Sequence, residues 1–135
     1  MKGMIDHVII NCIDHDKANT FYSWLLPKLG FTRRFPLASN SDVTGWIGHT
    51  TNVWLNVADP SVGRFDKERD ALRELAFAAD TREEVDEIAR EIEAHGGKIL
   101  DAPSEYPYFP GYYSVFFTDP DGIKLEVVVN PQHRL

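Results

Sequence analysis

An internal repeat constrains the fold of this chain more than any other feature of its sequence. Residues 7–30 combine a short apolar segment, an amphipathic helical pattern and a closing glycine, and residues 74–96 repeat that order. Three further strand-like segments follow each copy, so each half has the pattern βαβββ. A unit of roughly 60 residues cannot cover both faces of its own sheet, so the two copies are expected to pair and enclose a space. The sequence therefore predicts an α+β fold in which two tandem βαβββ modules form a cupped mixed sheet with helices outside.

The first module is predicted from its apolar spacing and its capping residues. Met4–Cys12 is rich in Val and Ile and too short for a helix, which indicates a strand. Apolar residues at 18, 21, 22 and 25 have the spacing of one helix face, with Asp14 as N-cap and Pro27 at the end. An antiparallel meander is then expected from three short apolar segments: Phe31–Leu37, Val43–Gly48 and Asn52–Ala58.

The second module repeats this order after a polar linker. Residues 59–70 form that linker, so one domain, 1–135, divides into a module at about 1–58 and another at about 71–130. Leu72–Ala79 predicts a strand, and Thr81 with Glu84 forms a capping box that starts the next helix. The remaining predictions are three strands and an aromatic loop: Lys98–Leu100, the loop Pro103–Gly111, Tyr113–Thr118 and Ile123–Asn130. The last two strands are joined by the turn Asp119-Pro120-Asp121-Gly122.

Charge and cysteine content exclude several classes of function. The net charge is −7, from 14 basic and 21 acidic residues, which is the wrong sign for a protein that binds nucleic acid. A single cysteine, Cys12, excludes an internal disulfide and favours a reducing, cytoplasmic compartment. No apolar segment approaches the roughly 20 residues of a membrane span. Nucleic acid and a membrane are therefore not expected as partners.

Three short motifs point to one family. They are "DHVII" around His7, "ELAFAAD" at the start of the second module and "DPDGIKLEVV" near the end. With the tandem βαβββ pattern, they resemble the vicinal oxygen chelate superfamily, which includes glyoxalase I, bleomycin-resistance proteins and extradiol dioxygenases. The segment "FPGYYSVFFTDPDG" resembles a bacterial glyoxalase-like subgroup.

The resemblance implies a metal site. In this family the ligands project from the first and last strands of each module, which are carried here by His7, Glu74, Glu126 and Asn56. His7, Glu74 and Glu126 would hold one divalent ion (Zn²⁺, Ni²⁺, Mn²⁺ or Fe²⁺), and Asn56 is a poor fourth ligand. Many relatives have His where this chain has Glu74, so a two-His dioxygenase site is not expected. Glu74, if displaced from the metal, is also the expected proton-transferring residue.

Strand alternation adds a set of expected substrate-binding residues. Trp54, Asn56, Tyr112, Ser114 and Phe116 share the interior of the cup if the strands are as predicted. Ordinary core packing is the alternative for the aromatic residues. The aromatic segment 106–113 is expected to form the rim of the site.

Two functional readings stay open from the sequence. The first is a metal-dependent lyase or isomerase whose small substrate chelates the ion through adjacent oxygens. The second is a metal-free binding protein of the bleomycin-resistance type. In that case His7 is a structural histidine, and Glu74 and Glu126 form a protonated carboxyl pair. The resemblance implies a homodimer in both cases.

Overall fold

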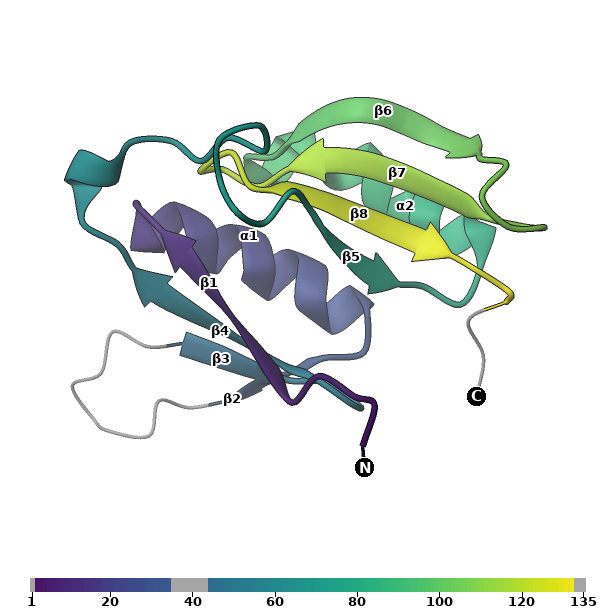
Figure 1. Cartoon of the computed structure of the whole chain (residues 1–135), viewed down its shortest axis with the longest axis horizontal. Coiled ribbons are helices and arrows are strands. Elements are labelled where there is room, and N and C mark those ends of the chain that lie inside the picture. The colour runs from purple at the N-terminus through teal and green to yellow at the C-terminus, as the bar shows by residue number, and fades with distance from the viewer. Residues whose placement is uncertain (1, 35–43, 133–135) are drawn as a thin grey trace. The chain divides into compact units, whose positions relative to one another are not determined.

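The computed structural model describes residues 2–34 and 44–132, and the chain divides into two compact units, Met1–Arg64 and Phe65–Leu135 (Figure 1). The boundary lies inside the predicted linker. Each unit is a βαβββ arrangement with a four-stranded mixed sheet, so the predicted α+β class is confirmed. Within the described ranges, no helix combines the length and the apolar character that crossing a bilayer requires.

Unit 1 has the strand order β1-β4-β3-β2. The outer strand β1 runs parallel to β4, and the other neighbours are antiparallel. A parallel pair needs a long crossover, and this one contains α1, β2 and β3. The elements are β1 (His7–Cys12), α1 (His15–Lys28), β2 (Thr32–Arg34), β3 (Thr44–Ile47), β4 (Asn52–Val57) and a 3-10 turn, Pro60–Val62. Residues 35–43, which include parts of two predicted strands, lie outside the described residues.

Helix α1 starts and ends as its sequence predicts. The Asp14 carboxylate accepts a hydrogen bond from the Lys17 N–H at 3.1 Å, which satisfies one of the free donors of the first turn. Pro27 lies within the last turn, and Gly30 then adopts a φ of 87°, which only glycine reaches without strain. One helix face is fully buried, and its residues are Ala18, Phe21, Tyr22, Leu25 and Leu26.

Unit 2 repeats the topology with the order β5-β8-β7-β6. Here β5 runs parallel to the central strand β8, while β7 is antiparallel to both β8 and β6. The elements are β5 (Leu75–Ala78), α2 (Arg82–Glu91), a 3-10 turn (Glu93–His95), β6 (Lys98–Glu105), β7 (Tyr113–Thr118) and β8 (Lys124–Val129). The matching strand orders of the two units confirm the internal repeat.

The capping box and the tight turn of unit 2 form as predicted. The Glu84 N–H donates to Thr81 Oγ1, and the Thr81 hydroxyl donates to Glu84 Oε1, both at 3.2 Å. Between β7 and β8, the Gly122 N–H donates to the Asp119 carbonyl at 3.1 Å. The buried Asp119 carboxylate also accepts two backbone N–H groups of the turn, which makes the turn a rigid lead into β8.

Three strand boundaries among the described residues differ from the sequence prediction by at least three residues. Strand β1 begins at His7 instead of Met4. Strand β5 begins at Leu75 instead of Leu72, so Glu74 lies one residue before the strand. Strand β6 continues to Glu105, through part of the expected Pro103–Gly111 loop. Pro103 is tolerated because β6 is an edge strand and its pairing with β7 is irregular there.

Candidate functional site

The site of unit 2 lies on the sheet face that α2 does not cover. Along β8, Leu125 and Val127 are fully buried apolar residues of the core face, so Glu126 points to the opposite face. The register pairs Glu126 with Ala76 of β5 on one side and with Phe116 of β7 on the other. Its carboxyl group therefore lies over the middle of the sheet, and only 2% of Glu126 is exposed.

Tyr112, the residue immediately before β7, contacts the Glu126 carboxyl group. The Tyr112 hydroxyl donates a short hydrogen bond to Glu126 Oε2. Burial raises the pKa of Tyr112, and the hydrogen bond and negative charge of Glu126 raise it further. Tyr112 therefore stays protonated at neutral pH and acts as a fixed donor.

The pKa of Glu126 is raised, with burial as the largest cause. The hydrogen bond from Tyr112 acts in the opposite direction, while a hydrogen bond with Glu74 and the charge of Glu74 raise the pKa further. The fully buried Ser114 hydroxyl is close enough to oppose the rise, although it makes no hydrogen bond of standard geometry. Glu126 thus keeps its proton to a higher pH than an ordinary glutamate, because it is buried and lies next to Glu74.

Lys124 completes the polar group on this face. Its Nζ atom lies 3.5 Å from Glu74 Oε1 and 4.8 Å from the centre of the Phe116 ring. The Lys124 side chain is 12% exposed and the Glu74 side chain 31%, so the ion pair is partly sheltered from water. The face therefore combines two carboxyl groups with one ammonium group.

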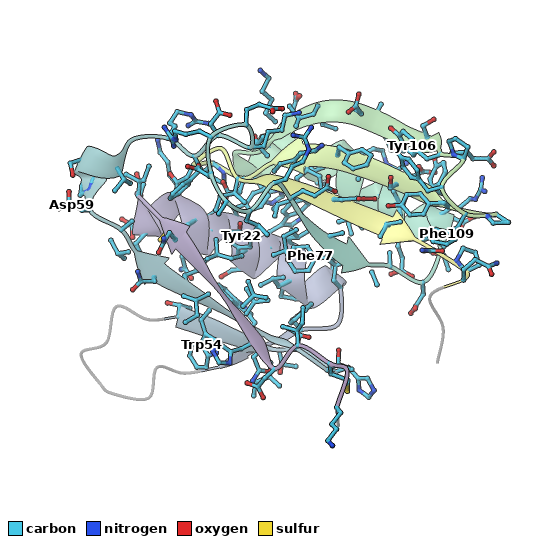
Figure 2. All side chains as sticks on the ribbon, viewed as in Figure 1. Tyr22, Trp54, Asp59, Phe77, Tyr106 and Phe109 are labelled. Carbon is cyan, nitrogen blue, oxygen red and sulfur yellow. The ribbon has the colours of Figure 1, made fainter. Side chains whose placement is uncertain are left out.

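An aromatic group covers the neighbouring part of the same face. The rings of Tyr106 and Tyr108 stack with centroids 5.6 Å apart, and Tyr106 meets the Phe116 ring edge-on at 5.4 Å. Tyr108 in turn meets Tyr112 edge-on at 5.2 Å. Figure 2 shows Tyr106 and Phe109 at one end of unit 2, where Phe109 is half exposed. The aromatic segment predicted as a rim thus contacts Phe116 and Tyr112, which lie next to Glu126.

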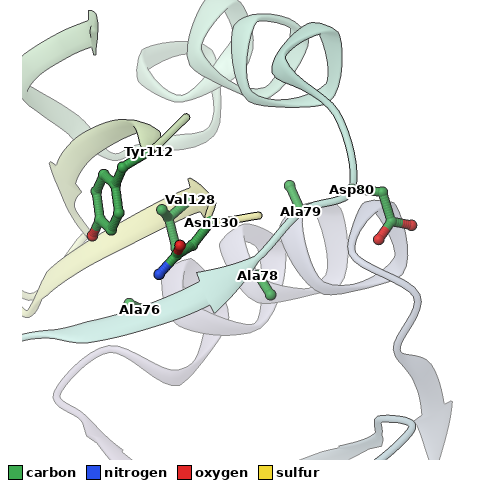
Figure 3. Close-up of a pocket in the computed structure, with 7 residues that line it drawn as sticks. All are labelled: Ala76, Ala78, Ala79, Asp80, Tyr112, Val128 and Asn130. Atoms are coloured by element: carbon green, nitrogen blue, oxygen red, sulfur yellow. The ribbon is translucent and has the colours of Figure 1, made fainter. Parts of the chain in front are cut away.

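A pocket of about 260 Å³ is lined in part by Tyr112, the residue that donates to Glu126 (Figure 3). Small side chains of β5 leave the space, and Tyr112 and Val128 form further walls. Tyr112 is shared with the carboxyl site, so the pocket and the pair belong to one region of unit 2. The residues that line it are Ala76, Ala78, Ala79, Asp80, Tyr112, Val128 and Asn130. The volume is near the lower limit of ordinary ligand sites, which suits a small molecule.

The remaining predicted residues lie in unit 1. The register pairs Ile9 with Trp54 and Asn11 with Asn56, and the amide of Asn56 donates to Asn11 Oδ1 at 3.0 Å. The Trp54 ring lies against Gly45, where an added Cβ would be 2.3 Å from the ring atom Cε3. His7 Nδ1 lies 2.7 Å from Asp6 Oδ1, with half of the His7 side chain exposed.

The structure therefore brings together the unit 2 residues of the predicted site, namely Glu74, Glu126, Tyr112, Ser114 and Phe116. His7, Trp54 and Asn56 are described with the other unit. Within 2–34 and 44–132, no three His, Cys, Asp or Glu side chains converge with metal-binding geometry. The set of His7, Glu74 and Glu126 thus stays a prediction.

Lys124 is a member of the site that sequence reasoning missed. Lys124 precedes Glu126 by two residues in a strand, so alternation alone places both on one face. Tyr106 lies in the aromatic segment expected at the rim, but its contact with the Phe116 ring depends on the path of the chain between β6 and β7 and could not be predicted. The available sequence signal was therefore a lysine two residues before Glu126 in the same predicted strand.

Comparison with known proteins agrees with this architecture. The profile of the Glyoxalase/Bleomycin resistance protein/Dioxygenase superfamily matches residues 4–127. The chain belongs to this superfamily. The resemblance predicted from its motifs is thereby confirmed.

Individual relatives match the glyoxalase-superfamily chain over nearly its full length. The uncharacterised protein YqjT of Bacillus subtilis (strain 168) is 26% identical over 90% of this chain and 95% of its own. A crystal structure from Bacillus halodurans, provisionally described as a glyoxalase, has 29% identity and a TM-score of 0.77, covering 96% of this chain and 97% of that one. Lactoylglutathione lyase from Agrobacterium tumefaciens, at 22% identity, 98% coverage of both chains and a TM-score of 0.65, shares the fold.

Proposed function

We propose that this protein is a metal-dependent lyase or isomerase whose small substrate chelates a divalent ion through adjacent oxygens. The observation that carries the proposal is the buried Glu126 carboxyl group beside Glu74, on the sheet face of unit 2 that α2 does not cover. Two carboxyl groups in such a place need a proton or a cation to offset their burial. Superfamily members commonly bind a metal, which is the cation expected here.

The chemistry of the donors fits a divalent ion. Glu74 and Glu126 offer carboxylate oxygens, and we assign the third position to the imidazole of His7. Asn56 would contact the substrate through its amide. The metal, when bound, would polarise a substrate carbonyl.

The protein's own residues then have separate roles. Tyr112 keeps its proton and fixes the orientation of Glu126 through the hydrogen bond to Oε2. Glu74 is the more exposed carboxyl group of the pair, so once displaced from the metal it can reach a substrate C–H next to a carbonyl. It takes the proton from that carbon and returns it to the adjacent atom, which isomerises the substrate without a net change in protons.

The surrounding side chains define the size and character of the substrate. Phe116 and the tyrosines around it present aromatic faces and edges to one side of the carboxyl pair. The alanine-lined pocket offers room for only a small group. The fully buried Ser114 hydroxyl lies near Glu126 at the base of the site. We therefore assign Trp54, Asn56, Tyr112, Ser114 and Phe116 to substrate binding.

Metal titration of the purified apo-protein tests this function. Mn²⁺, Fe²⁺, Ni²⁺ and Zn²⁺ are added separately, and the melting temperature and the bound metal per chain are measured. At least one ion should raise the melting temperature and bind in a 1:1 ratio, and His7→Ala should weaken that binding. If none of the four ions binds the wild type, the metal-dependent function is wrong.

A second candidate function is metal-free binding of a small molecule. The observation that favours it is the ion pair between Lys124 and Glu74. One ammonium and one shared proton balance the two carboxyl groups without any metal. In that case the same titration leaves all four ions unbound. An aromatic ligand should instead quench tyrosine fluorescence, and Tyr108→Ala should weaken that quenching.

We further propose a cytoplasmic homodimer in both cases. Cys12 is fully buried in unit 1, so the chain presents no described thiol for a disulfide between subunits. Sedimentation under reducing and non-reducing conditions should give the same dimer mass. A monomer at micromolar concentration would contradict the assignment.

A further inference from the structure

Lys124 is a charged residue that the proposed function leaves without a role. It lies in β8 two residues before Glu126, on the same open face of unit 2. Its side chain is 12% exposed, whereas most lysines extend into water. A lysine held in such a place needs partners that offset its loss of hydration.

Its two partners are a carboxylate and an aromatic face. The Nζ atom is 3.5 Å from Glu74 Oε1 and 4.8 Å from the centre of the Phe116 ring. Attraction by a ring face is strongest for a cation shielded from water, as Lys124 is. The ammonium is thus fixed next to the same Glu74 that is assigned to the metal.

We propose that Lys124 is the internal counter-ion of Glu74 and competes with a divalent cation for that carboxylate. This inference rests on the proposed metal-dependent function. A metal ion on Glu74 would stand within a few ångströms of the ammonium, and like charges at that distance repel strongly away from bulk water. On metal binding the Lys124 ammonium would leave Glu74, and the Phe116 ring would keep it close to the site.

Removing the ammonium should strengthen metal binding. Lys124→Met keeps an unbranched side chain of similar length that can pack against Phe116, but it has no charge. We expect it to bind Mn²⁺ at least about tenfold more tightly than the wild type, because the competing charge is gone. Lys124→Arg keeps the charge and should stay within about threefold of the wild type.

Two further variants make the comparison firm. Lys67→Met removes the same charge from an exposed ion pair with Glu68, so it corrects for the change in net charge. It should leave Mn²⁺ affinity within about twofold of the wild type. Lys124→Gln also removes the charge and replaces Lys124→Met if the latter does not fold, as judged by circular dichroism.

The experiment is calorimetric titration of each apo-protein with Mn²⁺ alone. Tighter binding by Lys124→Met or Lys124→Gln, but not by Lys124→Arg or Lys67→Met, supports the competition. Equal affinity in all five proteins overturns it and leaves the metal-dependent function intact. Binding only after removal of the lysine charge supports the competition and overturns the metal-dependent function of the wild type. Absence of binding in every variant overturns both.

Discussion

The two units share one topology, but the sheet faces that their helices do not cover carry different side chains. In unit 1 that face presents Ile9, which is 60% exposed, and a neutral amide pair between Asn11 and Asn56. In unit 2 the corresponding face holds Glu126, 2% exposed, in a network of carboxyl, phenol and ammonium groups. The comparison shows that a repeated strand topology does not determine which functional groups a sheet face carries. A few side chains on one face of unit 2 determine them.

The difference has a local physical cause. In unit 1 the Trp54 ring fills the space over Gly45, so a large side chain of β4 occupies this sheet face. In unit 2, β5 contributes small alanines, and the bulk comes instead from the aromatic residues between β6 and β7. Among the described residues, unit 2 therefore leaves room beside Tyr112, the donor to its buried carboxyl group.

The largest expected effect tests whether metal binding depends on the Glu126 carboxylate of unit 2 more than on Asn56 of unit 1. Glu126→Gln removes an anionic ligand while keeping the shape of the side chain, so Mn²⁺ affinity should fall on the order of 100-fold. The matched unit 1 variant, Asn56→Ala, should change it less than about fivefold. Both affinities are measured by calorimetric titration. A larger loss from Asn56→Ala than from Glu126→Gln would reverse the asymmetry.

The next effect concerns the two adjacent tyrosines at the start of β7. Tyr112→Phe leaves the buried Glu126 without its donor, and the free energy of unfolding should fall by about 1.5–3 kcal/mol. Tyr113→Phe, whose hydroxyl donates to Asp86 at 2.6 Å in a more exposed place, should cost about 1 kcal/mol.

Urea denaturation at pH 7 measures both losses, and Mn²⁺ titration of the folded variants provides the contrast. Only Tyr112→Phe should alter metal affinity, because its hydroxyl contacts a proposed ligand. Equal effects of both tyrosine variants on metal affinity would show that Tyr112 has no special relation to the site.

The pH dependence of stability offers a smaller effect that is specific to unit 2. The pKa of Glu126 is raised on folding, so the folded state holds a proton that the unfolded state releases at lower pH. This group's contribution is therefore fully present below the unfolded pKa near 4.5 and is lost as pH rises through the folded pKa.

Urea denaturation in the presence of a metal chelator, repeated from pH 4 to pH 8, should show this loss of unfolding free energy with rising pH in the wild type. Glu126→Gln has no group to titrate, so its stability curve should lack that component. Parallel curves for the two proteins would contradict the raised pKa.

The smallest effect on stability is expected from filling the pocket. Ala76 faces the pocket, so Ala76→Leu should change the free energy of unfolding by less than about 1 kcal/mol. It should nevertheless reduce ligand binding, since the larger side chain occupies the space. The unit 1 comparison is Gly45→Ala, which should cost about 1–3 kcal/mol because Trp54 must move. Thermal melts of both variants test this order.

Much of the fold could be predicted from local sequence because its causes are local. Asp14 and Thr81 cap their helices through bonds to residues three positions away, and that spacing is visible in the sequence. The turn before β8 depends likewise on Asp119 and Gly122. The length of β6 could not be predicted, since Pro103 indicates a loop unless the strand is known to lie at an edge.

The sequence by itself determined the repeat, the family motifs and the face on which Glu126 lies, because alternation along a strand follows from backbone geometry alone. Only the tertiary structure decided which groups meet there. Lys124 reaches Glu74, and Tyr112 reaches Glu126, through the pairing of β8 with β5 and β7. Distances across strands depend on register and on the return path of the chain, which local patterns do not contain.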